Sequence, residues 1–162
     1  MVTGPIQQPP TLAGNTRPPD PRRPTDPRRP AATPLGDLHP LARALAAAPA
    51  EPRWREHLLG GLGNVRRGFA EHVRVTGGPT GLYAELIGQA PRLAGAVRLL
   101  DREHVAITTA LSAFQQAAEA PDAPVGDLLD RAVHLLRALD GHRQRGADLL
   151  WAAYETDLGG ET

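Results

Sequence analysis

The hydrophobic residues between positions 91 and 118 recur in alternating steps of four and three, apart from one step of seven. Such steps place side chains on one face of an α-helix, so the pattern predicts a long helix with one buried face. The step of seven passes over His104. An imidazole at a core position is costly unless it finds a polar partner, so His104 is a candidate for function. The apolar members of the series are Leu93, Val97, Leu100, Ile107, Leu111, Phe114 and Ala118.

Two other segments show the same interruption. Residues 51–76 and 125–157 are each predicted to form a long helix, bounded by proline and glycine residues. The apolar face of the first continues through His72, and that of the second continues through His142. Three long helices are therefore predicted to carry one histidine each in the register of the core, whereas the other three histidines lie beside the apolar faces.

Shorter helical patterns lie within residues 35–48 and 79–90. The connection between the last two long helices is short and contains proline, so these helices are predicted to be antiparallel. The sequence thus predicts an all-α antiparallel bundle over residues 35–162, with three long helices and one or two short ones. Gly146 lies inside the last helix, where glycine costs roughly 1 kcal/mol relative to alanine. We interpret it as a site of close backbone approach or of a local kink.

Residues 1–34 hold most of the chain's 17 prolines and almost no apolar residues. Such a segment cannot offset the entropy of ordering, so a disordered Pro/Arg-rich tail is predicted. The motif DPRRPT is followed directly by DPRRP over positions 20–30. The repeat is interpreted either as a solvated linker or as a docking strip, whose partner the sequence does not identify.

The three core-register histidines are predicted to converge. His104 lies about 15 residues before the last turn and His142 about 18 after it, which brings them almost level in antiparallel helices. His72 reaches the same layer if the segment after it folds back. Imidazoles converging from facing helices suit iron, zinc or manganese, with Glu85 and Glu103 as candidate carboxylate ligands. The alternative is a hydrogen-bonded structural layer that holds no metal.

Four segments carry a pattern shared with a known family, namely FAEH at residues 69–72, GLYAEL at 81–86, LLDREHVAITTAL at 99–111 and the ending HRQRGADLLWAAYETDLGG. Together they resemble the hemerythrin-like (HHE cation-binding) family, in its small actinobacterial type. The resemblance covers about residues 53–160. It implies a four-helix bundle with a non-haem di-iron site that handles oxygen, nitric oxide, peroxide or iron itself.

The ligand pairs of that family are incomplete in this chain. The family uses His-x-x-x-Glu, His-x-x-x-His and His-x-x-x-x-Asp pairs, but here the fourth residues after the three histidines are Thr76, Thr108 and Gly146. One histidine per helix is present without its paired second ligand. A mononuclear site, or a bundle without metal, therefore fits the residues as well as a di-iron site does.

Charge and composition restrict the remaining functions. The formal net charge is zero, which argues against nucleic-acid binding through a basic surface. No apolar run is long enough to span a membrane and no secretory signal is recognised, so a cytoplasmic protein is expected.

No phosphate loop, nucleotide fingerprint or Ser-His-Asp order is present, which leaves a weak metal-dependent oxidase or peroxidase activity as the one enzymatic route. The second function considered is a metal-free helical interaction module with a disordered arm. Trp151 and Tyr154 lie off the apolar face of the last helix, so they are expected to pack against the short helix at 38–48 or against a second subunit, and a homodimer is considered.

Overall fold

The computed structural model describes residues 35–155 and contains only helices within them. The predicted tail at 1–34 and the last residues of the C-terminal helix pattern lie outside the described residues. In chain order the elements are α1 (His39–Ala46), α2 (Trp54–Thr76), α3 (Leu82–Gln89), the 3₁₀ turn η1 (Pro91–Leu93), α4 (Ala94–Glu119) and α5 (Val125–Glu155). The all-α class, with three long helices and two short ones, is therefore confirmed.

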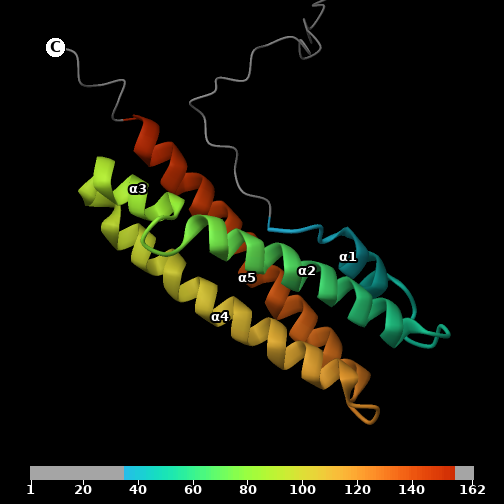
Figure 1. Ribbon diagram of the computed structural model, residues 1–162. Helices are drawn as coiled ribbons and strands as arrows, with labels where there is room; N and C mark the ends of the chain where they lie inside the picture. Colours follow the sequence, from blue (N-terminus) through green and yellow to red (C-terminus); the bar gives the residue numbers. More distant parts are fainter. Residues whose placement is uncertain (1–34, 156–162) are drawn as a thin grey trace, which may run out of the picture. The chain divides into compact units, whose positions relative to one another are not determined.

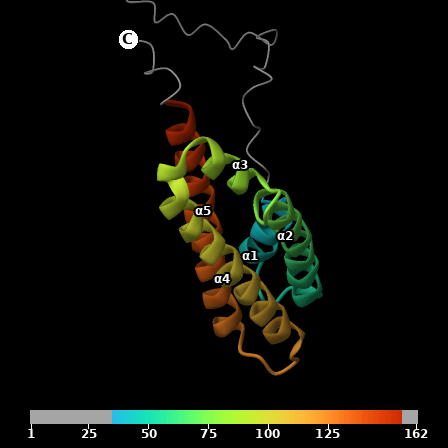
Figure 2. The same cartoon turned by 60° about the vertical axis from the view of Figure 1, so that its left-hand side comes forward.

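The helices are arranged around two long antiparallel neighbours, α4 and α5, which pack along each other (Figure 1). Helix α2 packs against α4, and α1 lies against the first half of α2. Helix α3 and the turn η1 reverse the chain between α2 and α4, at the end where α5 finishes (Figure 2). Within residues 35–155, none of the helices combines the length and the apolar character that crossing a bilayer requires.

The periodic positions predicted from the sequence form the core. Every apolar position predicted between residues 93 and 118 is buried, and so is the face predicted for α2. The face predicted for α5 is buried from Leu128 to Leu149 except at Gly146, which is half-buried, as is Ala153 at its end. His72, His104 and His142, which we call the histidine layer, are buried with them. By contrast, Trp151 is 64% exposed, so the packing against the short helix at 38–48 that the sequence offered for it is not observed.

The histidine layer separates two hydrophobic clusters. The main cluster joins α1, α2 and the adjoining parts of α4 and α5, and includes Phe69, Ile107 and Leu139. The second cluster joins α3, η1 and the start of α4 to the end of α5, and includes Leu100 and Leu149. The polar layer therefore lies between the larger apolar core and a smaller one at the α3 end.

Helix α1 is held against α2 at very short range. A Cβ atom on Gly61 would lie 2.7 Å from Cα of Leu41, and a Cβ atom on Gly68 would lie 2.3 Å from Cα of Gly36. The indole nitrogen of Trp54 also donates a hydrogen bond of 2.8 Å to the carbonyl of Ala44. Glycine is needed at positions 61 and 68 because any side chain there would push the two segments apart.

This packing predicts opposite effects for two adjacent glycines of α2. Gly61→Ala is expected to lower the free energy of unfolding by about 1–3 kcal/mol, because the new methyl group meets the backbone of α1. Gly60→Ala is the matched control, since a Cβ atom there meets nothing within 4 Å. It is expected to raise the free energy of unfolding by roughly 0.5–1 kcal/mol through helix propensity. Urea denaturation measures both changes, and equal effects at the two positions would contradict the packing described.

Candidate metal centre

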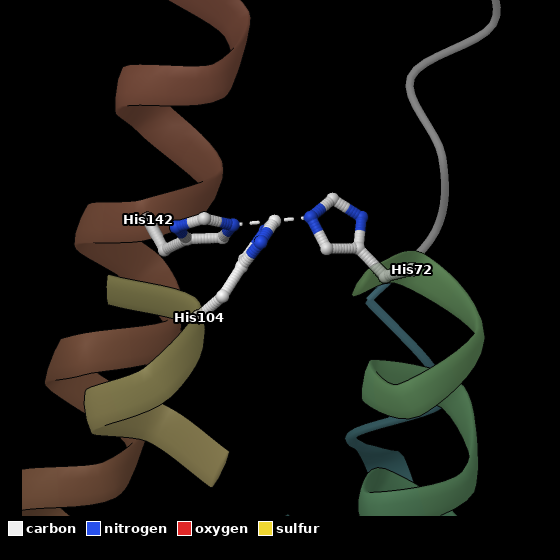
Figure 3. Close-up of side chains that lie close together, drawn as sticks. All are labelled: His72, His104 and His142. Atoms are coloured by element: carbon white, nitrogen blue, oxygen red, sulfur yellow. Dashed lines mark hydrogen bonds between the residues drawn. The ribbon is translucent and has the colours of Figure 1, made fainter. Parts of the chain in front are cut away.

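Three helices bring the histidine layer together. His72 lies in the last turns of α2, His104 in α4 and His142 in the second half of α5 (Figure 3). Their side chains are buried, with relative exposures of 7%, 5% and 1% respectively. Each residue offers one ring nitrogen, and these three atoms lie within 4.8 Å of one another. The predicted convergence of the three histidines is thus observed.

A chain of hydrogen bonds fixes the ring of His142. Its Nδ1 lies 2.9 Å from Oε2 of Glu103, and Nε of Arg145 lies 2.6 Å from the other oxygen of this carboxylate. An ionised carboxylate only accepts hydrogen bonds, so Nδ1 of His142 carries the proton. In the neutral ring Nε2 then carries a lone pair directed into the histidine layer.

The second nitrogen of His142 contacts His72. The two Nε2 atoms lie 3.0 Å apart, which is a hydrogen-bond distance (Figure 3). Because Nε2 of His142 is the acceptor, Nε2 of His72 is the donor when both rings are neutral. A metal ion bound by both Nε2 atoms would replace this proton, so metal binding would require His72 to change its tautomer.

His104 has a different environment. Its Nε2 is buried and has no hydrogen-bond partner among the described residues, and its Nδ1 lies 3.9 Å from Oδ1 of Asp101, beyond hydrogen-bond distance. Burial, together with the neighbouring rings of His142 and His72, lowers the pKa of His104 to about 4. The ring is therefore neutral at physiological pH, which is the state that a metal ligand requires.

Two aromatic side chains enclose the layer. The ring of Phe69 lies 5.8 Å from that of His72 and 5.9 Å from those of His104 and His142. On the other side the ring of Tyr83, from α3, stacks on His104 at 5.6 Å with an interplanar angle of 13°. Burial raises the pKa of Tyr83 to about 12, while a hydrogen bond with Thr76 opposes this rise. Tyr83 is thus a neutral phenol that shields the layer.

The candidate carboxylates have separate positions. Glu103 contacts the outer nitrogen of His142, so it orients that ring from outside the group of three converging nitrogens. Glu85 is exposed on α3 and does not belong to the group. Direct ligation by either residue stays a prediction. Arg145 and Tyr83 were not predicted as part of the site from the sequence. The one signal for Arg145 is its position one helical turn after a core-register histidine.

The three imidazoles fit a transition-metal ion in their chemistry. Neutral imidazole nitrogens bind zinc, iron and copper well. Nitrogens bonded at about 2.1 Å to one ion would lie roughly 3.0–3.4 Å apart at coordination angles between 90° and the tetrahedral value. The 3.0 Å between His72 and His142 is already in that range. The widest spacing, up to 4.8 Å, requires the rings to close by roughly 1.5 Å.

Comparison of the chain with protein-family models, with curated proteins and with solved structures finds no match. The resemblance to hemerythrin-like proteins therefore rests only on the sequence segments at residues 69–72, 81–86, 99–111 and 142–160.

The low pKa of His104 predicts a specific loss of stability in acid. The unfolded chain protonates this ring near its ordinary pKa of 6.5, whereas the folded chain does so only near 4. Between these values the unfolded state binds more protons, so the free energy of unfolding falls as the pH falls. The fall due to this one ring is expected to be on the order of 2 kcal/mol.

Urea denaturation of the chelator-treated protein between pH 7 and pH 4 measures this loss. His104→Leu is expected to lose less stability over the range than the wild type, because its core position no longer titrates. His57→Leu is the matched control, since His57 is exposed on α2. Identical pH dependence for the wild type and His104→Leu would contradict the assignment.

Proposed function

We propose that the protein is a metal-binding helical bundle that holds one divalent transition-metal ion through His72, His104 and His142. The observation that carries the proposal is the convergence of three buried imidazoles from three helices, with Nε2 of His104 unpartnered. A buried polar nitrogen without a partner costs about 1–3 kcal/mol. Coordination of a metal ion would give that nitrogen a partner and would tie the three helices together.

The donor set favours one ion over a di-iron centre. Paired iron ions in helical bundles are held largely by carboxylates, whereas no carboxylate belongs to the group of three nitrogens within residues 35–155. Three neutral ligands leave the charge of the ion uncompensated, so an anionic or polar fourth ligand is favoured. Iron and zinc suit these nitrogens, and manganese suits them less because it prefers oxygen ligands.

The resemblance to the hemerythrin-like family supports a role with small oxygen- or nitrogen-containing molecules. In this proposal the chain is a divergent relative of that family, with a single ion in place of the pair. The metal supplies Lewis acidity and, if it is iron, redox chemistry. The chain's own residues contribute the three ligands, the Glu103 contact that orients His142, and the Phe69 and Tyr83 rings that pack against the ligand rings.

A metal-free helical interaction module is the second candidate. Its support is the hydrogen bond between His72 and His142, which partners two of the three rings without an ion. Under this alternative, replacing His104 by leucine removes an unpartnered polar group and makes the protein more stable. The two functions therefore differ in what the wild-type protein retains on purification.

The proposal predicts about one metal ion per chain in protein purified anaerobically without a histidine tag. Elemental analysis for iron, zinc, manganese and copper measures this. His104→Ala is expected to lose most of the metal, because one of three ligands is removed. His57→Ala is the matched control and is expected to keep the full content. Wild-type protein that stays metal-free even after incubation with each ion would support the interaction module instead.

The contact between Glu103 and His142 predicts a weaker site in Glu103→Ala. Loss of the carboxylate that orients a ligand ring is expected to reduce metal affinity about 10–100-fold. Glu103→Gln keeps an acceptor for Nδ1 and is expected to lose less affinity. Glu71→Ala is the control, because Glu71 is exposed and pairs with Arg74 on the surface of α2. Competition with a chromophoric chelator measures the affinities, and an unchanged value for Glu103→Ala would exclude the orienting role.

A further inference from the structure

A small cavity adjoins the histidine layer on the side of α5. Its volume is about 50 Å³, and both His72 and His142 line it. Thr76 and Tyr83 contribute to the same wall, and Gly146 lies on α5 one turn after His142. The exposed residues Arg143 and Ala147 flank the cavity on its outer side. The cavity therefore extends from two of the three proposed ligands toward the surface.

Gly146 has no packing reason to be a glycine. A Cβ atom at this position would meet nothing within 4 Å outside the backbone of its own helix. Close backbone approach, one of the two interpretations offered by the sequence, is thus contradicted for Gly146. Glycine inside a helix is nevertheless less stable than alanine by roughly 1 kcal/mol. Gly146 is one of the residues that line the cavity, so a larger residue at position 146 would add its side chain at the cavity wall.

The size of the cavity limits what it can hold. A buried water needs roughly 10–15 Å³ of such space. The cavity of about 50 Å³ therefore accommodates a few waters or a ligand of two or three heavy atoms. Leucine and alanine side chains form much of the remaining wall. Such a wall, with a few polar groups at one end, is typical of a binding space rather than of bulk solvent.

We infer that this cavity is the entry and binding space for a small molecule or anion with an oxygen or nitrogen donor, and that Gly146 keeps it open. The inference rests on the proposed function, because the ligand is expected to complete the coordination of the ion held by His72, His104 and His142. Polar residues of the lining, Thr76, Tyr83 and Arg143 beside the two histidines, are available to such a ligand. Gly146 is then a residue that determines the size of the ligand.

The experiment uses cobalt(II)-loaded protein and azide as the probe. Cobalt content is measured first by elemental analysis, and azide binding is then followed through the visible absorption of cobalt. Gly146→Ala is expected to weaken azide binding several-fold, and Gly146→Leu at least about tenfold, because the side chain fills the space. Both variants are expected to bind cobalt as the wild type does, because residue 146 does not belong to the converging group.

Gly126 provides the matched control. It lies on the same helix, a Cβ atom there also meets nothing within 4 Å, and it does not line the cavity. Gly126→Ala and Gly126→Leu are expected to bind azide like the wild type. Chemical denaturation verifies that each variant is folded.

The outcomes separate the two proposals. Azide affinity that falls with the size of residue 146 but not of residue 126 supports the inference. Cobalt-loaded wild type that does not respond to azide, or Gly146→Leu that binds azide like the wild type, overturns it and leaves the metal site intact. Wild type that binds no cobalt overturns the proposed function and the inference together.

Discussion

The need to give partners to three buried imidazoles constrains the whole centre of this bundle. The histidine layer lies between apolar clusters, where every nitrogen that loses water must be compensated within the protein. Glu103 compensates His142, and His142 in turn accepts from His72. His104 lies beside the two other rings without a comparable contact at Nε2. The hydrogen-bonding capacity of the layer is therefore only partly satisfied. The unpartnered nitrogen of His104 is what metal coordination would satisfy.

The residues around the histidine layer fix the positions of its three rings. Arg145 is placed one turn after His142 on α5, where its guanidinium pairs with the carboxylate of Glu103 and helps to orient it. The ring of Phe69 packs against all three imidazole rings, and the ring of Tyr83, from α3, stacks on that of His104. These contacts come from four helices, so the geometry of the site depends on how α3 reverses the chain between α2 and α4.

Periodicity alone predicted the helices and the three histidines, because both are encoded in residues three and four apart. The buried face of α4 matches the predicted positions as far as Ala118 at its end, and His72 is buried on α2 as predicted. The pairing of Glu103 with His142 and Arg145 depends on the rotation of α4 against α5, which a one-dimensional pattern does not contain. The stacking of Tyr83 depends on the direction of a short helix between two turns. Close backbone approach, one of the two interpretations of Gly146, was wrong, since an empty space beside a residue leaves no trace in the sequence.

The division of the core by the histidine layer has a consequence for how the protein opens. The second cluster, built around α3, η1 and the end of α5, is small and meets the main cluster through a polar boundary. Two apolar units joined in this way can unfold with different free energies, because the boundary adds little hydrophobic cohesion between them. An ion bound to His72, His104 and His142 would bridge α2, α4 and α5 across that boundary. Occupancy of the layer would then decide whether amide hydrogen exchange reports one cooperative unit or two.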